Sequence, residues 1–475
     1  MIVFNRTSGL CIPTTYKEEK FYQFIKEKLT RRFKNFNDPT YTICKFFIEG
    51  EKVLKIPRFF PVWDYVLCKV ENKISDGEDI EINHKITLRD DLQKDTVNYM
   101  LSNDKGIIQA SPGSGKTIMS IYVVAERKKK TIIICHRDSL VEQWIGPGTP
   151  DKPQGFLSHT DINPDEIGRL TSANFKKVLK KKIIVCTDQS FISLLKRNRQ
   201  EFLIELNQAN IGIFIGDEIH TAVGAPTFSE CSLHIPAKVV FGLSATPKRK
   251  DSTNDILEAH LGKIFVPEGK SSTMDARVTV LLFDFNVIRG REKYMYWLGK
   301  FQRSRYLNLI KNSKMFLGVS MSLLEKFVND GRQIIFMSER IKLIDKLFVL
   351  LKTEDKAIFI GGTKNDVLDK QVVFSTPGKI RDGVDIPKKD CLIMTSPIDN
   401  IDQMSGRIVR ISKDKEEPLI VDCVDIGCPE IFKTIFPRME FYNSKGWKVR
   451  YIYISSTGEK TEIDQIQVLK LSQGE

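Results

Sequence analysis

The chain has 475 residues, is 41% hydrophobic and 28% charged, and carries a formal net charge of +13 with an isoelectric point near 9.1. This length predicts two or three domains. No apolar run approaches the roughly eighteen residues of a membrane span, and no basic-then-apolar leader follows Met1, so we expect a soluble, cytoplasmic protein without a membrane partner. The positive charge favours a polyanionic partner, with nucleic acid as the leading candidate.

Residues 1–86 are predicted to form a small α+β domain distinct from the rest of the chain. Apolar residues recur at helical spacing over residues 21–29, and strand-like runs cover residues 41–48 and 66–70. Basic and aromatic residues mix in two stretches, Arg31 to Phe36 and Arg58 to Trp63. This mixture fits a nucleic-acid surface, but a solvated basic helix end beside core aromatics explains it equally well.

The next feature is a glycine-rich turn between a predicted strand and a predicted helix. The apolar run 106–109 leads into Ala110-Ser111-Pro112-Gly113-Ser114-Gly115-Lys116-Thr117, and residues 118–124 continue with helical spacing. Strand, turn and helix in this order are the context of a phosphate-binding loop. The inner glycines let backbone N–H groups close around phosphate oxygens at the helix N-terminus. A glycine turn without a ligand is the alternative.

Two side chains directly after these glycines would complete a nucleotide site. Lys116 can reach the β- and γ-phosphates, and the Thr117 hydroxyl can bind Mg²⁺. The loop therefore predicts binding of a nucleotide together with Mg²⁺.

Apolar runs that end in polar residues alternate with helical segments beyond the loop. They cover residues 131–137, 183–190, 211–216 and 239–247. This alternation predicts a parallel sheet whose ligand lies at the carboxyl ends of the strands. The third run ends in Asp217-Glu218-Ile219-His220, so one acid can hold Mg²⁺ while the other orients or deprotonates an attacking water. An acid-rich surface turn is the alternative for an isolated pair.

The order of these motifs resembles the superfamily 2 helicases and nucleic-acid translocases, with a DEIH box. In the first half, motif Q matches Gln93, motif I matches residues 110–117, motif II matches Asp217 to His220, and motif III matches Ser244-Ala245-Thr246. In the second half, motif IV matches residues 333–340, motif V matches residues 372–378 with 382–387, and motif VI matches residues 403–410.

The resemblance implies an α/β fold of two tandem RecA-like parallel-sheet domains, residues 87–266 and 267–475, after the small N-terminal α+β domain. Residues 289–314 are predicted to be helical, basic and aromatic, and either core packing or a nucleic-acid-facing helix explains their composition. Beyond Pro429 we predict a helix that reaches Tyr442 and a terminal hairpin.

Motif VI contributes two cations. Because Arg407 and Arg410 are three residues apart, they are predicted to project from one helical face and to present two fixed positive charges to a phosphate. They can act as arginine fingers that stabilise the transferring γ-phosphoryl group. A solvated basic helix end is the alternative.

The resemblance also implies a role for each matching residue. For ATP binding it implies Arg89, Gln93, Pro112, Gly113, Ser114, Gly115, Lys116, Thr117, Gly383 and Asp385. For Mg²⁺ it implies Thr117 and Asp217, and for hydrolysis it implies Lys116, Asp217, Glu218, Gln403, Arg407 and Arg410. For nucleic-acid contact it implies Arg137, Thr187, Gln189, Ser338 and Thr376, and for coupling it implies His220, Ser244 and Thr246.

The position of Arg89, four residues before Gln93, resembles the DNA translocase branch with UvsW-type phage, RecG-like and XPB-like enzymes. We therefore expect a monomeric, ATP-dependent DNA helicase or translocase that remodels forked or branched DNA in replication, recombination or repair. An RNA helicase or transcript-release factor with the same motor stays open, as does a nucleic-acid-binding scaffold that has lost hydrolysis. A phage origin would place the protein in the host cytoplasm.

Overall fold

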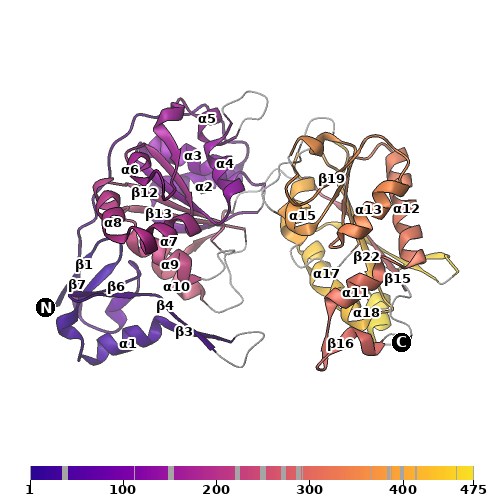
Figure 1. The fold of residues 1–475 in the computed structure, drawn as a ribbon, viewed down its shortest axis with the longest axis horizontal. Helices are drawn as coiled ribbons and strands as arrows, with labels where there is room; N and C mark the ends of the chain where they lie inside the picture. The colour runs from indigo at the N-terminus through magenta and orange to yellow at the C-terminus, as the bar shows by residue number, and fades with distance from the viewer. Residues whose placement is uncertain are drawn as a thin grey trace. The chain divides into compact units, whose positions relative to one another are not determined.

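The computed structural model describes most of the chain as two compact units, Met1–Ser271 and Ser272–Glu475. Each unit is built around one large sheet (Figure 1). The described residues are 2–473 without 35–40, 112, 148–153, 220–224, 246–252, 269–273, 285–289, 291, 364, 382–385, 387, 396–400, 412–414 and 456. The domain boundaries predicted after residues 86 and 266 stay predictions.

The N-terminal part of the first unit is a small mixed sheet with one helix and a separate hairpin, which confirms the predicted α+β composition. The sheet has the order β5-β6-β2-β1-β7, in which only β1 and β7 pair in parallel. Its elements are β1 (Ile2–Arg6), β2 (Leu10–Pro13), α1 (Lys20–Lys28), β5 (Ile48–Glu49), β6 (Val53–Ile56) and β7 (Cys68–Asn72). The hairpin consists of β3 (Thr30–Lys34) and β4 (Tyr41–Lys45).

This small sheet packs against the helices of the larger sheet in the same unit. Its core includes Ile256 and Ala259, which belong to a helix of the larger part. Arg58 is 1% exposed, and its guanidinium donates hydrogen bonds to the backbone carbonyls of Ser232, Ile235 and Ala237. The interpretation of Arg58 as part of a nucleic-acid surface is therefore wrong, because its guanidinium is buried and hydrogen-bonded to carbonyl groups inside the unit.

The large sheet of the first unit is parallel throughout, with the order β10-β11-β9-β12-β13-β8-β14. Its strands are β8 (Lys105–Gln109), β9 (Thr131–Cys135), β10 (Ile167–Arg169), β11 (Ile183–Thr187), β12 (Ile213–Asp217), β13 (Val239–Ser244) and β14 (Ile264–Phe265). The strands are continuous apolar runs because helices cover both faces. Ile213 and Ile215 belong to one core and Phe214 to the other, as the two-residue period of a strand requires.

Helices of the first unit divide between these two faces. One face carries α2 (Asp91–Ser102), α3 (Lys116–Arg127), α4 (Asp138–Ile145) and α5 (Gly155–His159). The other carries α6 (Phe175–Val178), α7 (Asp188–Arg197), α8 (Arg199–Gln208), α9 (Ala225–His234) and α10 (Asn254–Leu261). Because all strands of the sheet are parallel, their carboxyl ends lie at the same edge.

The second unit repeats the plan with the order β19-β20-β18-β21-β22-β15-β23-β24, where only β24 is antiparallel to its neighbour. Its strands are β15 (Arg277–Phe283), β18 (Ile334–Met337), β19 (Lys356–Phe359), β20 (Val372–Ser375), β21 (Cys391–Met394), β22 (Leu419–Asp425), β23 (Lys448–Ile454) and β24 (Lys460–Ile463). One face carries α11 (Arg303–Ile310), α12 (Lys314–Asn329) and α13 (Ile341–Leu350). The other carries α14 (Pro377–Arg381), α15 (Ile401–Ile408), α17 (Ile435–Ser444) and α18 (Gln465–Gln473), while α16 (Pro429–Phe432) contributes to both cores. The two sheets confirm the predicted tandem RecA-like architecture.

One predicted helix is interrupted. Within the stretch 289–314, β16 (Tyr296–Trp297) and β17 (Lys300–Phe301) form an antiparallel hairpin before α11 begins. Leu298 and Gly299 have φ of 48° and 73°, the left-handed backbone that a two-residue hairpin turn needs. Leucine rarely adopts this conformation, so the aromatic pattern alone did not indicate the turn.

Across the described residues, no helix is both long enough and apolar enough to span a bilayer.

Candidate active site

The phosphate-loop sequence forms a turn between β8 and α3, as predicted. Gly113 and Gly115 have φ of 83° and 92°, a backbone that glycine adopts without a steric penalty. The Ala110 amide donates to the Ser244 carbonyl at 3.0 Å, which ties the start of the loop to the end of β13. The helix begins at Lys116, so its N-terminal amides face the concave side of the turn.

Lys116 connects the loop to the acidic motif. Its Nζ donates to the Ala110 carbonyl at 3.0 Å and lies 3.8 Å from the Glu218 Oε1. The lysine side chain is 9% exposed, so this charge is held in a fixed position. Thr117 follows in the first turn of α3 and is half-buried. The structure thus brings Lys116, Thr117 and Glu218 to one end of the sheet.

Asp217 closes β12 and is 8% exposed. The indole Nε1 of Trp144 on α4 donates to its Oδ2 at 2.8 Å, and Trp144 itself has no exposed surface. No sequence motif had indicated a role for Trp144. The N–H of a buried tryptophan usually has a hydrogen-bond partner, and this general requirement is the one signal that could have indicated a polar contact for Trp144.

The electrostatics of this carboxylate are unusual for a surface acid. The pKa of Asp217 is raised to about 6, first because burial disfavours the charged form and second because Glu218 lies beside it. The hydrogen bond from Trp144 and the positive charge of Lys116 act in the opposite direction. A cation bound beside Asp217 would therefore favour the charged form of its carboxylate.

Glu218 adopts a strained backbone. Its φ is 50°, a left-handed conformation that costs a non-glycine residue about 1–2 kcal/mol. The next amide, that of Ile219, donates to the Leu243 carbonyl at 3.2 Å and so holds the turn against β13. Such strain concentrates at functional sites, where the surrounding structure enforces it.

Gln93 links the start of α2 to the phosphate loop. Its Oε1 accepts from the Arg89 amide at 2.8 Å, and its Nε2 donates to the Ser114 carbonyl at 2.8 Å. An added Cβ on Gly115 would lie 2.4 Å from the same Nε2, so glycine is required at this contact. The Arg89 side chain pairs with Asp90 and is 41% exposed. Gln93 therefore lies against the loop, whereas the Arg89 side chain contacts its neighbour Asp90.

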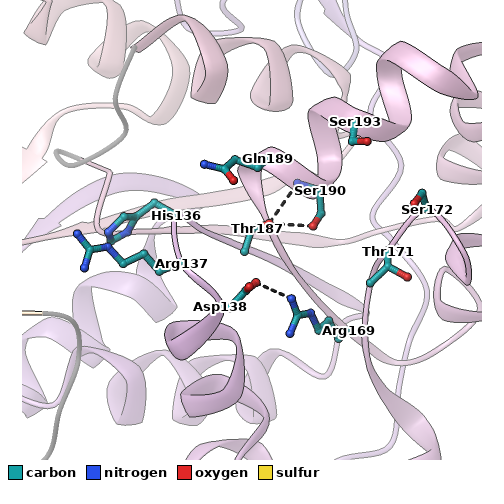
Figure 2. Close-up of a pocket in the computed structure, with 10 residues that line it drawn as sticks. All are labelled: His136, Arg137, Asp138, Arg169, Thr171, Ser172, Thr187, Gln189, Ser190 and Ser193. Atoms are coloured by element: carbon teal, nitrogen blue, oxygen red, sulfur yellow. Dashed lines mark hydrogen bonds and ion pairs between the residues drawn. The ribbon is translucent and has the colours of Figure 1, made fainter. Parts of the chain in front are cut away.

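A second feature of the same sheet edge is a polar pocket of about 510 Å³ (Figure 2). It is lined by His136, Arg137, Asp138, Arg169, Thr171, Ser172, Thr187, Gln189, Ser190 and Ser193. Three of these, Arg137, Thr187 and Gln189, were predicted nucleic-acid contacts. The residues near Arg169 were missed because β10 is only three residues long and shows no clear apolar run.

Inside this pocket several polar groups are already oriented by neighbours. The Thr187 hydroxyl accepts from the Ser190 amide at 3.1 Å and caps α7. Arg169 pairs with Asp138 at 2.5 Å, as Figure 2 shows. Hydroxyl, amide and guanidinium groups thus line one hollow without a large apolar surface, which suits a charged backbone rather than an apolar ligand.

In the second unit, the predicted contacts follow the ends of two neighbouring strands. Ser338 comes directly after β18 and Thr376 directly after β20. Ser338 is 2% exposed, and its hydroxyl accepts from the Arg340 amide at 3.2 Å, so it shapes the start of α13. Thr376 is half-buried. Their roles stay predictions.

The motif VI arginines differ in position from the expectation. Arg407 lies in α15 and is 7% exposed, but the helix ends at Ile408 and Arg410 comes after it. The prediction that both project from one helical face is therefore wrong, because the helix stops between them.

Several predicted residues lie outside the described residues. These are Pro112, His220, Thr246, Gly383 and Asp385. Gln403 lies within α15, and its side chain is also outside the described set.

Comparisons with known proteins agree with these motifs. Residues 67–249 match the family described as "Type III restriction enzyme, res subunit". "Putative ATP-dependent RNA helicase L396" of Acanthamoeba polyphaga mimivirus is 26% identical over 432 residues, 86% of this chain and 78% of that protein. The "General transcription and DNA repair factor IIH helicase/translocase subunit XPB" of Schizosaccharomyces pombe is 26% identical over 348 residues, 68% of this chain and 42% of that protein.

Solved structures share the fold. The "ATP-dependent Type ISP restriction-modification enzyme LlaBIII bound to DNA" aligns with a TM-score of 0.52 and 15% identity over 82% of this chain and 32% of that chain. T4 UvsW aligns over 96% of this chain and 100% of that chain with 14% identity and a TM-score of 0.39, from which we draw no conclusion. The sequence matches to helicases, the two parallel sheets and the loop motifs together identify the chain as a member of superfamily 2 of the ATP-dependent helicases and translocases.

Proposed function

We propose that the protein is an ATP-driven DNA helicase or translocase that remodels forked or branched DNA in replication, recombination or repair. One observation carries the proposal. Lys116, Asp217 and Glu218 converge at the carboxyl edge of the first sheet, where Trp144 holds Asp217 and the phosphate loop holds Lys116. A polar pocket opens at the same edge.

The phosphate loop would bind the triphosphate through its backbone amides and through Lys116. In the structure, the lysine ammonium interacts with the Ala110 carbonyl and the Glu218 carboxylate. On nucleotide binding, it exchanges these partners for β- and γ-phosphate oxygens, which leaves Glu218 to orient the attacking water and accept its proton. Gln93 and Arg89 would contact the base.

The residues present also fit a divalent cation. A buried carboxylate with a raised pKa beside a second acid is stabilised by a cation, and a hydroxyl follows the loop lysine. Asp217 and Thr117 would hold Mg²⁺, which when bound neutralises charge on the phosphate oxygens. The proposed contribution of the second unit is charge stabilisation by Arg407 and Arg410, together with Gln403.

The remaining motif residues are proposed to connect hydrolysis to movement. We assign Arg137, Thr187 and Gln189 of the pocket, with Ser338 and Thr376, to the nucleic-acid backbone. Such contacts ignore base identity, so binding is expected to be salt-sensitive and largely independent of sequence. Coupling is assigned to His220, Ser244 and Thr246 in the first unit and to Gly383 and Asp385 in the second.

Among the relatives whose names mention DNA or RNA, DNA is mentioned more often. The matching family is described as a restriction-enzyme subunit, XPB is named as a DNA repair factor, and LlaBIII was solved bound to DNA. RNA is the second candidate because L396 is named as an RNA helicase. The polar pocket favours neither, since backbone contacts serve both polymers.

The motor assignment is tested by replacing the loop lysine. Lys116→Ala is expected to lower nucleic-acid-stimulated ATPase activity at least about a hundred-fold, because the lysine contacts the transferring phosphates. The control is Lys94→Ala on α2, an exposed lysine in a surface ion pair, which is expected to change the rate by less than about two-fold. Full stimulated activity in Lys116→Ala would contradict the assignment.

The substrate is tested by one panel of nucleic acids. ATPase stimulation and strand separation are measured with forks, Holliday junctions, overhangs and RNA hybrids of matched length. The proposal expects the branched DNA substrates to give the largest stimulation. Stimulation by RNA alone would favour the RNA helicase instead.

A further inference from the structure

The hairpin β3–β4 is an arm with two different faces. Its register pairs Arg32 with Ile43 and Lys34 with Tyr41. Because side chains alternate across a strand, Arg32, Tyr41, Ile43 and Lys45 share one face of the two-stranded ribbon. Figure 1 shows the hairpin extending from the small sheet past α10.

The opposite face anchors the arm to the unit. Phe33 and Cys44 are partly buried against the core of the small sheet. Arg31 pairs with Asp255 on α10 at 2.5 Å. The same face therefore holds the hairpin to the unit in two ways, by packing of Phe33 and Cys44 and by the ion pair from Arg31 to α10.

Four described side chains on the face that carries Arg32 are exposed. Tyr41 and Ile43 are 60% and 57% exposed, and Arg32 and Lys45 are also exposed. Within the described residues of β3 and β4, this face carries no acid, and neither Arg32 nor Lys45 enters an ion pair. Two cations thus flank an aromatic ring and an aliphatic side chain that the unit itself leaves uncovered.

One alternative is that the charged residues on this strand only prevent association with other sheets, as they do on many edge strands. That role does not require an exposed tyrosine or isoleucine, which would favour such association. Cations that track a backbone, together with an aromatic side chain on which bases stack, are the combination that single-stranded nucleic acid binds. The absence of acids on this face removes the repulsion that a polyanion would meet.

We propose that the outward face of the β3–β4 hairpin is a second nucleic-acid contact, separate from the pocket of Figure 2. Arg32 and Lys45 bind the phosphate backbone, and Tyr41 stacks on a base with Ile43 beside it. The inference rests on the proposed function, because it assumes that the chain acts on nucleic acid. It adds a contact made by the N-terminal part that none of the helicase motifs supplies.

The test removes the two charges and keeps the size of the side chains. Arg32→Gln/Lys45→Gln is compared with Lys20→Gln/Lys52→Gln, a pair of exposed lysines on the same part of the unit. Lys20 begins α1, whose nine residues span about 13 Å before the hairpin starts, and the two double variants lose the same net charge. Binding of a fluorescein-labelled single strand and of a labelled fork is followed by anisotropy over a range of salt.

The hairpin variant is expected to bind about ten-fold more weakly than wild type, and the slope of log affinity against log salt is expected to fall by about 1.4–1.8. The control pair is expected to stay within about two-fold. ATPase activity at saturating DNA is expected to be unchanged, with only the DNA concentration for half-stimulation raised. Thermal melting verifies that both variants are folded.

The aromatic contact has its own test. Tyr41→Ala is expected to weaken binding about five-fold or more without changing the salt slope, and Tyr41→Phe is expected to restore it because stacking needs only the ring. If Arg32→Gln/Lys45→Gln binds as the control pair does, the inference is overturned. In that case, wild-type ATPase activity that nucleic acid still stimulates would leave the proposed function intact.

Discussion

Two buried aspartates, one in each large sheet, have opposite surroundings. Asp422 in β22 is 1% exposed, and it accepts hydrogen bonds from the Arg438 guanidinium at 2.7 and 3.2 Å and from the Tyr442 hydroxyl at 3.0 Å. Asp217 at the end of β12 is 8% exposed, and it accepts one from Trp144 but has Glu218 as its neighbour. Asp422 forms an ion pair with the Arg438 guanidinium, whereas the residue next to Asp217 is a second acid.

The difference separates a structural group from a functional one. A buried ion pair with additional hydrogen bonds satisfies its own charge, and burial beside Asp422 raises the pKa of Tyr442 well above its usual value. The raised pKa of Asp217 indicates that burial and the neighbouring Glu218 disfavour its charged form. Such an unfavourable charge is typical of a functional site, where a bound cation and phosphate would stabilise the charged carboxylate.

The largest expected effect is on catalysis. Glu218→Gln keeps the size of the side chain but removes the base, so ATP hydrolysis is expected to fall about a hundred- to ten-thousand-fold. ATP binding, measured with a fluorescent analogue, is expected to persist because the phosphate loop and Lys116 are unchanged. Hydrolysis within ten-fold of wild type would remove Glu218 from its assigned role.

The matching change in the second sheet is expected to act on stability. Arg438→Ala leaves Asp422 as a buried unpaired charge, so the free energy of unfolding of that unit is expected to fall by about 3–5 kcal/mol. Arg450→Ala, which breaks an exposed pair with Glu462, is the control and is expected to cost no more than about 1 kcal/mol. Urea denaturation followed by near-ultraviolet circular dichroism measures both. Equal losses would mean that burial does not distinguish the two pairs.

The same contrast explains which parts of the fold and of the site could be predicted from the sequence. Local signals were strong where consecutive residues carry the chemistry, so the phosphate loop, the Asp217–Glu218 pair and both parallel sheets were predicted. Trp144 lies 73 residues from Asp217, and the helix pattern around it is the same whether its indole faces carbon or a carboxylate. Such contacts depend on strand order, which the residue pattern did not specify.

Two further errors came from the backbone and from burial. The stretch 289–314 was predicted as one helix, because nothing in its composition indicates that Leu298 adopts positive φ. Arg58 was grouped with exposed basic residues, although three carbonyls at the end of α9 and just beyond it bind it inside the unit. A cation beside aromatics fits a surface or an interface equally well until the packing partner is known.

A more moderate effect is expected from removing one hydrogen-bond donor at each aspartate. Trp144→Phe removes the bond that lowers the pKa of Asp217, so the pKa rises further above about 6. ATPase activity at pH 7 is expected to fall about ten-fold, because a hydrogen bond to a charged group contributes about 1.5 kcal/mol. The loss is expected to be greater at pH 6 than at pH 8, because the protonated carboxyl cannot hold a cation.

Stability responds to the same group with a defined sign. Since the folded pKa of Asp217 exceeds the unfolded value of 3.8, its stabilising contribution is present below about pH 4 and is lost as pH rises through about 6. Tyr442→Phe is the matched control at Asp422, and it is expected to lower stability by about 1–2 kcal/mol while ATPase activity stays unchanged. A pH profile of Trp144→Phe parallel to that of wild type would show that the indole does not tune Asp217.

The smallest expected effect concerns the backbone strain at Glu218, which has no counterpart at Asp422. Glu218→Gly and Glu218→Gln both lose the carboxylate, but only glycine accepts φ of 50° without strain. The Glu218→Gly protein is therefore expected to be more stable than the Glu218→Gln protein by about 0.5–1 kcal/mol, after the entropy of the unfolded glycine is subtracted.

Lys128→Gly, with φ of 51° at the end of α3, is the control and is expected to gain a similar amount of stability while retaining ATPase activity. If Glu218→Gly is no more stable than Glu218→Gln while Lys128→Gly gains, the strain at the acid is relaxed by its neighbours. The cost of the site would then lie in its charges alone.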